Sequence, residues 1–106
     1  MIARTWHGIV PAGKAGAFEK HLIATGVNDT KSIPGNLGSY IYHQTQDGFE
    51  HFFMISYWKD FEAIKAFAGP KPQIAVTYPG DSEFELISDP IVLHHEVSRI
   101  TADFPI

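Results

Sequence analysis

The sequence contains no cysteine, which excludes thiolate chemistry, disulfides and cysteine-ligated zinc. No hydrophobic run is long enough to span a membrane, and the N-terminal residues lack the apolar core of a signal peptide. Lysine and arginine are scattered, and the formal net charge is −4, so no electrostatic footprint for nucleic acid is present. These absences predict a cytoplasmic protein that binds neither membranes nor nucleic acid.

Aromatic residues are abundant by contrast. They make up 13% of the 106 residues, and hydrophobic residues together make up 44%, a globular rather than a disordered composition. A chain of this length forms one domain. We expect that domain to cover residues 1–98, followed by a C-terminal tail, 99–106, that contains Pro105 and extends away from the body.

The first half of the chain alternates between the periodicities of strands and helices. Apolar spacing predicts a strand over 2–10, a helix over 12–25 that stops at Gly26, a polar loop over 27–32, and strands over 37–46 and 49–58. Asp47-Gly48 is a strong hairpin signal between the last two strands. These two strands should therefore form an antiparallel pair.

The second half repeats the order strand, helix, strand. Asp60 is a suitable N-cap for a helix over 61–68. A helical turn over 73–78, a short strand over 82–87 and a final strand over 91–97 follow. The order β-α-β-β-α-β predicts an α+β, ferredoxin-like (split βαβ) fold, with both helices on one face of an antiparallel sheet. Because several strands are apolar on both sides, we expect a second copy of the chain to cover the other face in a homodimer.

The final strand carries the first candidate for chemistry. His94 and Glu96 share one of its faces, while His95 lies on the other. A histidine suits proton transfer near neutral pH, and Glu96 could orient or charge it. The alternative is a histidine that is hydrogen-bonded within the sheet or the interface. A metal site is not predicted, because a metal ion would need three convergent ligands and the spacing along this strand supplies at most two.

Residue groups along almost the whole chain resemble the antibiotic biosynthesis monooxygenase domain. They are Arg4-Thr5-Trp6-His7-Gly8, Gly26, Pro34-Gly35, Tyr57-Trp58, Glu62-Ala63, Phe67-Ala68-Gly69, Tyr78-Pro79 and His94-His95-Glu96-Val97. The resemblance implies a dimeric α+β barrel. The activities it implies include cofactor-free oxygenation of phenols or anthrones, haem degradation and modification of autoinducers.

The resemblance also implies a pocket between the helices and the sheet, with no bound cofactor. Its expected walls are Trp6, Trp58, Phe67 and Tyr78. Its expected catalytic residues are Arg4, His94 and Glu96. Core packing remains the alternative for both tryptophans, and Arg4 could either clamp a substrate anion or pair with Glu96. The predicted function is a cofactor-independent monooxygenase acting on a small aromatic or polyketide-like phenol; the alternative is a non-catalytic ligand-binding or stress-associated domain.

The haem-degrading branch of the family is characterised by residues at three places, which can be checked in this sequence. The resemblance implies an Asn on the first strand, a Trp on the second helix and a His shortly after it. Those places hold Trp6, Phe67 and either Thr77 or Tyr78. Since all three positions differ, the sequence disfavours haem degradation.

Overall fold

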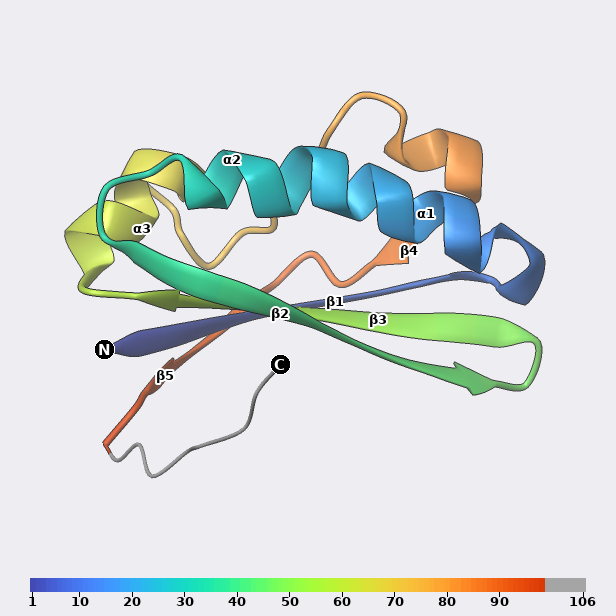
Figure 1. Ribbon diagram of the computed structural model, residues 1–106, viewed down its shortest axis with the longest axis horizontal. Helices are drawn as coiled ribbons and strands as arrows, with labels where there is room; N and C mark the ends of the chain where they lie inside the picture. Colours follow the sequence, from blue (N-terminus) through green and yellow to red (C-terminus); the bar gives the residue numbers. More distant parts are fainter. Residues whose placement is uncertain (99–106) are drawn as a thin grey trace.

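A computed structural model describes residues 1–98, so the predicted tail, 99–106, lies outside the described residues. One antiparallel sheet carries the helices on one of its faces (Figure 1). This arrangement confirms the predicted ferredoxin-like α+β fold. No helix in the described part of the chain is long and apolar enough to cross a membrane.

The sheet has its first strand near the centre. The strands are β1 (Ile2–Pro11), β2 (Asn36–Gln46), β3 (Phe49–Trp58), β4 (Ile87–Ser88) and β5 (Leu93–Glu96). The helical segments are η1 (Ala12–Lys14), α1 (Ala15–Leu22), η2 (Ile23–Val27), α2 (Asn28–Lys31), α3 (Phe61–Ala68) and η3 (Asp81–Phe84). The strand order is β2-β3-β1-β4, and β5 also pairs with β1. Both C-terminal strands therefore meet the same edge of β1.

The central hairpin forms where the sequence predicts it. Asp47 and Gly48 both have positive φ angles, 53° and 82°, as a type I′ turn requires. The turn leads β2 into an antiparallel register with β3 in which Tyr42 lies opposite Phe53. The local twist of this turn matches the twist of the two strands, which is why two residues suffice.

The first helical stretch does not stop at Gly26, and the predicted loop over 27–32 is wrong. The chain continues through the π-helical segment η2 into α2, which ends at Lys31. Gly26 is buried, and a Cβ atom there would lie 3.1 Å from the Met54 sulfur. Thr30 donates a hydrogen bond from Oγ1 to the Gly26 carbonyl at 2.9 Å. The glycine thus lets the helix approach the sheet closely instead of ending it.

The second helix follows its local signals. The Asp60 carboxylate accepts a hydrogen bond from the Ala63 N–H at 2.9 Å, which caps the start of α3. At the other end Gly69 has φ 84° and donates its N–H to the Lys65 carbonyl. The predicted helix over 61–68 is confirmed.

The predicted helical turn over 73–78 is wrong. Gln73 lies in a turn, Ile74 forms an isolated antiparallel bridge with Ile91, and residues 75–78 have no regular secondary structure. The Val92 N–H donates to the Gln73 carbonyl and the Ala75 N–H to the Pro90 carbonyl, each at 2.9 Å. A short apolar run does not distinguish helix from strand by its periodicity. Here the backbone groups are satisfied by a segment that comes later in the chain.

The predicted strand over 82–87 is also wrong in most of its length. Residues 81–84 form η3, a 3-10 turn flanked by left-handed residues at Gly80 and Glu85. Only Ile87 and Ser88 join the sheet, opposite Ile9 and Gly8 of β1. The left-handed backbone at Gly80 and Glu85 turns the chain at both ends of η3, so the alternation of Phe84 and Leu86 does not produce a strand.

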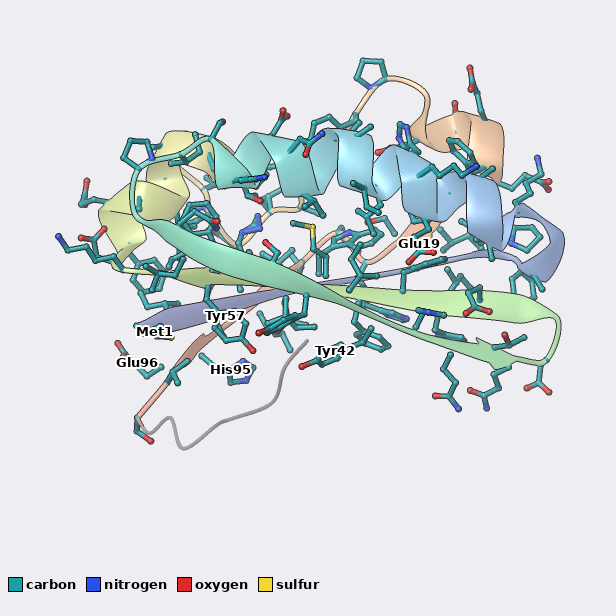
Figure 2. The ribbon with its side chains drawn as sticks, in the orientation of Figure 1. Met1, Glu19, Tyr42, Tyr57, His95 and Glu96 are labelled. Carbon is teal, nitrogen blue, oxygen red and sulfur yellow. The ribbon has the colours of Figure 1, made fainter. Side chains whose placement is uncertain are left out.

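Two apolar clusters hold the helices to the sheet. One contains Val10, Phe18, Leu22, Phe52 and Met54, and the other contains Ile2, Trp58, Ala63 and Ile64. The opposite face of the sheet carries Tyr42, Tyr57 and His95 (Figure 2). No helix of the described residues covers that face (Figure 1).

Candidate functional site

A cavity of about 50 Å³ lies between the helices and the sheet. Its aromatic walls are Trp6, Phe18, Phe67 and Tyr78. Its polar lining consists of Arg4, Thr25, Thr30, Ser56 and Asp81. Four of the residues predicted for the site therefore meet in one place, although β1, α3 and the 73–78 segment are far apart in the sequence.

Arg4 projects from β1 toward the helices and is only 4% exposed. Its Nη2 donates hydrogen bonds to the carbonyls of Pro72 at 3.2 Å and Ile74 at 3.3 Å. The guanidinium carbon lies 5.5 Å from the centre of the Phe67 ring, within the range of a cation–π contact. Nε is buried and has no hydrogen-bond partner. Burial lowers the pKa of Arg4 to about 10, so the side chain is charged at neutral pH.

Tyr78 brings a phenol into the same cavity. Its hydroxyl is buried. Burial is the largest cause that raises the pKa of Tyr78, followed by the hydrogen-bonding interaction of the hydroxyl with the Asp29 carboxylate and by the negative charges of Asp29 and Asp81. The phenol is therefore neutral at pH 7 and can donate its proton to a ligand oxygen. The backbone of Tyr78 is fixed by its N–H, which donates to the Asp81 carboxylate at 2.9 Å.

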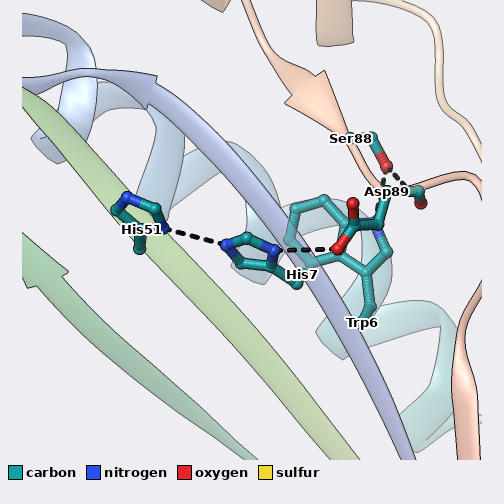
Figure 3. Close-up of polar contacts among 5 residues, drawn as sticks. All are labelled: Trp6, His7, His51, Ser88 and Asp89. Atoms are coloured by element: carbon teal, nitrogen blue, oxygen red, sulfur yellow. Dashed lines mark hydrogen bonds and ion pairs between the residues drawn. The ribbon is translucent and has the colours of Figure 1, made fainter.

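Trp6 forms the wall of the cavity on β1. Its indole N–H donates to the Ser88 hydroxyl at 2.8 Å, which ties β4 to β1 (Figure 3). The ring lies 6.2 Å from the Phe18 ring. A Cβ atom on Gly8 would lie 2.5 Å from the indole. Gly8 is therefore the residue that makes room for Trp6 on this face of β1.

His7 faces the other side of β1 from Trp6, because successive side chains of a strand alternate. Its Nδ1 lies 2.8 Å from the Asp89 carboxylate, and its Nε2 lies 3.0 Å from Nδ1 of His51 (Figure 3). The His7 ring also stacks on Phe53 at 4.4 Å. Because Asp89 follows β4 directly, this contact fastens the same strand that Trp6 holds from the helix side. His7 is part of the sheet's opposite face and not of the cavity.

His94 lies directly opposite Arg4 in the register of β1 and β5. The imidazole is half-buried, and its Nε2 has no hydrogen-bond partner. Burial is the main cause that lowers the pKa of His94, and the charge of Arg4 adds to it. His94 does not line the cavity, and its ring contacts Phe61 of α3 at 5.4 Å. The imidazole is thus a neutral neighbour of Arg4, beside the cavity.

Glu96 is exposed and lies opposite Ile2. Within residues 1–98, no hydrogen bond or ion pair joins it to His94 or to Arg4. The shared strand face that the sequence predicts is present. Among these residues, Glu96 makes no contact that would orient the His94 imidazole, and it does not pair with Arg4.

The buried imidazole should appear in the dependence of stability on pH. In unfolded chains a histidine has a pKa of about 6.5. The pKa of His94 is lower in the folded state, so below pH of about 6.5 the unfolded chain takes up a proton that the folded chain resists, and stability falls. We expect urea unfolding of His94→Gln to lose less stability between pH 7 and pH 5 than the wild type.

The exposed neighbour allows a matched control. His95→Gln changes the adjacent side chain on the other face of β5. An equal flattening of the pH profile in both variants would contradict the assignment to the buried imidazole of His94.

Trp58 is a core residue and does not line the cavity. It is 0% exposed, and its indole N–H donates to the Ser56 hydroxyl at 2.8 Å. Its ring stacks against Phe67 at a centroid distance of 6.0 Å. Trp58 therefore supports the wall that Phe67 presents, and the core-packing alternative describes its position.

Asp81 is a lining residue that the sequence does not indicate. Its carboxylate lies 2.6 Å from Nε2 of His21 on α1. Both side chains are mostly buried, and His21 packs against Phe84. The turn η3 brings Asp81 over α1 from sixty positions later in the chain, and no local motif signals such a contact.

Residues 1–98 contain no group of three or more histidine, aspartate or glutamate side chains that could hold a metal ion. The cavity lining contains the carboxylate of Asp81 but no histidine.

The antiparallel sheet, the helices on one face and the cavity between them define a ferredoxin-like α+β domain with an internal site. The chain belongs to the antibiotic biosynthesis monooxygenase family, whose model matches residues 5–71. A comparison with curated proteins found no match.

Solved structures share this fold over nearly their whole length. A Deinococcus radiodurans protein assigned to the antibiotic biosynthesis monooxygenases is 14% identical with a TM-score of 0.63, covering 99% of this chain and 100% of its own. The haem-degrading protein of Mycobacterium tuberculosis is 26% identical with a TM-score of 0.60, covering 96% and 100%. SnoaB, a cofactor-independent oxygenase from Streptomyces nogalater, is 12% identical with a TM-score of 0.58, covering 96% and 98%.

Proposed function

We propose that the protein binds a small aromatic molecule in the cavity and oxidises it as a cofactor-independent monooxygenase. One observation carries this proposal: Arg4 Nε is buried without a hydrogen-bond partner, and Arg4 lines an aromatic-walled cavity. Buried polar atoms are normally hydrogen-bonded, so an unpaired one requires an explanation. A ligand oxygen beside Arg4 provides one. The family to which the chain belongs and the similarity of its fold to the cofactor-independent oxygenase SnoaB support the reaction type.

The proposed oxygenation requires few groups from the protein. An ionised phenol or enol gives an electron to dioxygen directly, so the site needs donors for the oxyanion and walls that exclude water. For an anthrone-type substrate, the ring CH₂ becomes a carbonyl; one oxygen atom enters the product and the other leaves as water with the two hydrogens. Trp6 and Phe67 are the proposed walls, and Arg4 and Tyr78 the proposed donors.

The roles predicted for His94 and Glu96 remain predictions. His94 is neutral and adjoins Arg4, so a base role requires the ligand or the 73–78 segment to move toward it. Glu96 has no contact that would orient the imidazole. Arg4 is the better supported of the three proposed catalytic residues, because it alone lines the cavity.

A homodimer is part of the proposal. The face of the sheet opposite the helices carries Phe53 and Leu93 next to Tyr42 and Tyr57, and no described helix covers it. A second copy is the simplest cover for such a surface. We expect sedimentation velocity at micromolar concentration to give about twice the chain mass of 11.8 kDa. A stable single chain would contradict this.

Haem is the second candidate ligand, because the Mycobacterium tuberculosis haem-degrading protein is 26% identical to this chain. The cavity argues against it. No histidine lines it. Its volume of about 50 Å³ is below that of a haem and of an anthrone alike, so either ligand requires the lining to move apart, and it is the residue types that disfavour haem. Phe67 also stands where the resemblance implies a tryptophan. Titration with haem, followed in the visible spectrum, should give no saturable binding at one haem per chain.

Dioxygen uptake tests the proposed function. The wild-type protein should consume one dioxygen per anthrone, and should yield the anthraquinone and water without added metal or flavin. Binding of such a molecule without uptake would favour the alternative of a non-catalytic ligand-binding or stress-associated domain.

The expected cytoplasmic location is a separate prediction, which a fluorescent fusion would check.

A further inference from the structure

The cavity between the helices and the sheet is closed to a molecule as large as an aromatic ring. Its volume is about 50 Å³, whereas a buried apolar cavity that binds benzene measures about 150 Å³. Part of the lining must therefore move before such a ring can enter. Three lining residues, Tyr78, Asp81 and Leu86, belong to one connecting segment, whose turn η3 lies beside α1 (Figure 1).

The backbone of this segment, residues 78–86, is bonded mainly to itself. The N–H groups of residues 81, 83 and 85 donate to carbonyls three positions earlier, at 3.0–3.2 Å. In the described part of the chain, no backbone–backbone hydrogen bond joins residues 80–85 to a strand or to another helix. Gly80 and Glu85 have φ angles of 92° and 54°, and such a value is strained for a residue other than glycine. The turn can therefore move as a unit between these two positions.

The rest of the lining is held more firmly. The strands β1 and β3 pair along the whole of Ile2–Pro11. Phe18 and Leu22 anchor α1 in an apolar cluster. Arg4 holds the carbonyls of residues 72 and 74. Segments that move to admit ligands come from the less firmly bonded parts of a fold, and here that part is the segment 78–86.

One mostly buried contact holds the segment against α1. Asp81 Oδ1 lies 2.6 Å from His21 Nε2, and the two side chains are 22% and 16% exposed. The other carboxylate oxygen of Asp81 accepts a hydrogen bond from the Tyr78 N–H at 2.9 Å. The Phe84 ring packs on the His21 imidazole at 4.9 Å. Water and salt screen such a contact less than an exposed one, so the His21–Asp81 pair is the main attachment of the segment.

A second contact with the same helical stretch is exposed. Lys14 Nζ lies 3.1 Å from the Glu85 carboxylate, and it donates to the Glu83 carbonyl at 3.0 Å. An exposed ion pair of this kind contributes little to stability. Lys14 therefore provides a matched control for His21.

We propose that residues 78–86 form a lid over the cavity, that the His21–Asp81 contact holds the lid closed, and that the lid moves away from α1 to admit the ligand. The inference rests on the proposed function for the ligand that enters, whereas the opening itself is a property of the free protein. Closure over a bound ring would exclude water from the site. His21 does not line the cavity, so it is a positioning residue that acts through Asp81.

Cysteine labelling measures the opening, because the sequence has no cysteine of its own. Ser56→Cys places a thiol in the cavity lining, and Val92→Cys places one at a buried position outside it; both native residues are 3% exposed. When opening is fast relative to labelling, the rate of alkylation by iodoacetamide follows the population of the open form. We expect Ser56→Cys to react at least about tenfold faster than Val92→Cys.

The closing contact is tested in the same two cysteine variants. His21→Ala should speed labelling of Ser56→Cys about tenfold to a hundredfold, as expected for the loss of a hydrogen bond to a charged group. It should leave labelling of Val92→Cys unchanged. His21→Gln keeps a side-chain N–H donor and should stay closer to the wild-type rate. Lys14→Ala should change the rate by less than about fivefold.

Equal labelling rates for Ser56→Cys and Val92→Cys would overturn the lid. Equal acceleration of both by His21→Ala would indicate a general loosening of the fold and would overturn the role of His21, as would a larger effect of Lys14→Ala. Should Ser56→Cys fail to fold by circular dichroism, Met54→Cys, at another residue of the lining, replaces it. Opening without dioxygen uptake would leave the lid and remove the proposed function, whereas uptake with equal labelling rates would leave the proposed function and remove the lid.

Discussion

Replacing Trp58 with alanine is expected to lower the free energy of unfolding by about 3–5 kcal/mol. The indole is 0% exposed and packs with Ile2, Ala63 and Ile64 in one of the two apolar clusters. Its removal leaves a large cavity that the surrounding sheet and α3 cannot fill. Urea unfolding followed by far-ultraviolet circular dichroism measures the loss, with the chain concentration held fixed because a dimer couples unfolding to dissociation.

Trp58→Phe is the control for this variant. It keeps an aromatic ring in the cluster but removes the N–H that donates to Ser56, a buried hydroxyl. We expect a smaller loss, of about 1–3 kcal/mol, from the unpaired hydroxyl and the reduced volume. A loss below about 1 kcal/mol in Trp58→Ala would contradict the core assignment and would return Trp58 to the walls of the ligand site.

The parts of the fold that the sequence predicts correctly are those set by neighbouring residues. Asp47-Gly48 specifies its hairpin, and Asp60 with Gly69 bounds α3, since each signal acts within a few positions of the backbone it shapes. Gly26 gives the same local signal as a helix end, but packing against Met54 decides otherwise. The 73–78 segment is not helical, because residues 90–92 bond to the backbone of residues 73–75, and that contact is not visible in either segment alone.

The candidate site likewise contains some residues that local sequence patterns predict and others that only the fold brings together. Arg4 and Trp6 share a strand face by simple alternation, so their joint exposure to the cavity follows from the sequence. Phe67 and Tyr78 enter through the family resemblance. Asp81 depends on the turn η3 folding over α1, which only the three-dimensional structure shows. His94 has the predicted face but not the predicted place, because β5 sets it opposite Arg4 at the edge of the site.

The largest effect on activity is expected at Arg4. In a cofactor-independent oxygenation the rate depends on how well the site stabilises the ligand's oxyanion, and loss of one preorganised donor typically costs about 10²–10³-fold in turnover. Arg4→Met should therefore reduce dioxygen uptake with an anthrone by about that factor. Its fold should persist, because exchanging a buried charge without a counter-charge for an apolar side chain of similar length is often neutral or stabilising.

The His94→Ala variant tests whether the oxyanion donor Arg4 or a general base at His94 contributes more to the rate. His94 lies outside the cavity lining, so its removal should reduce uptake less than Arg4→Met does. A positioned general base contributes about 10²–10⁴-fold. A loss of that size in His94→Ala, with Arg4→Met near the wild-type rate, would reverse the assignment and make the imidazole the group that ionises the substrate. Sedimentation of each variant shows whether the chain's assembly state is unchanged, so a loss of uptake can be attributed to the site.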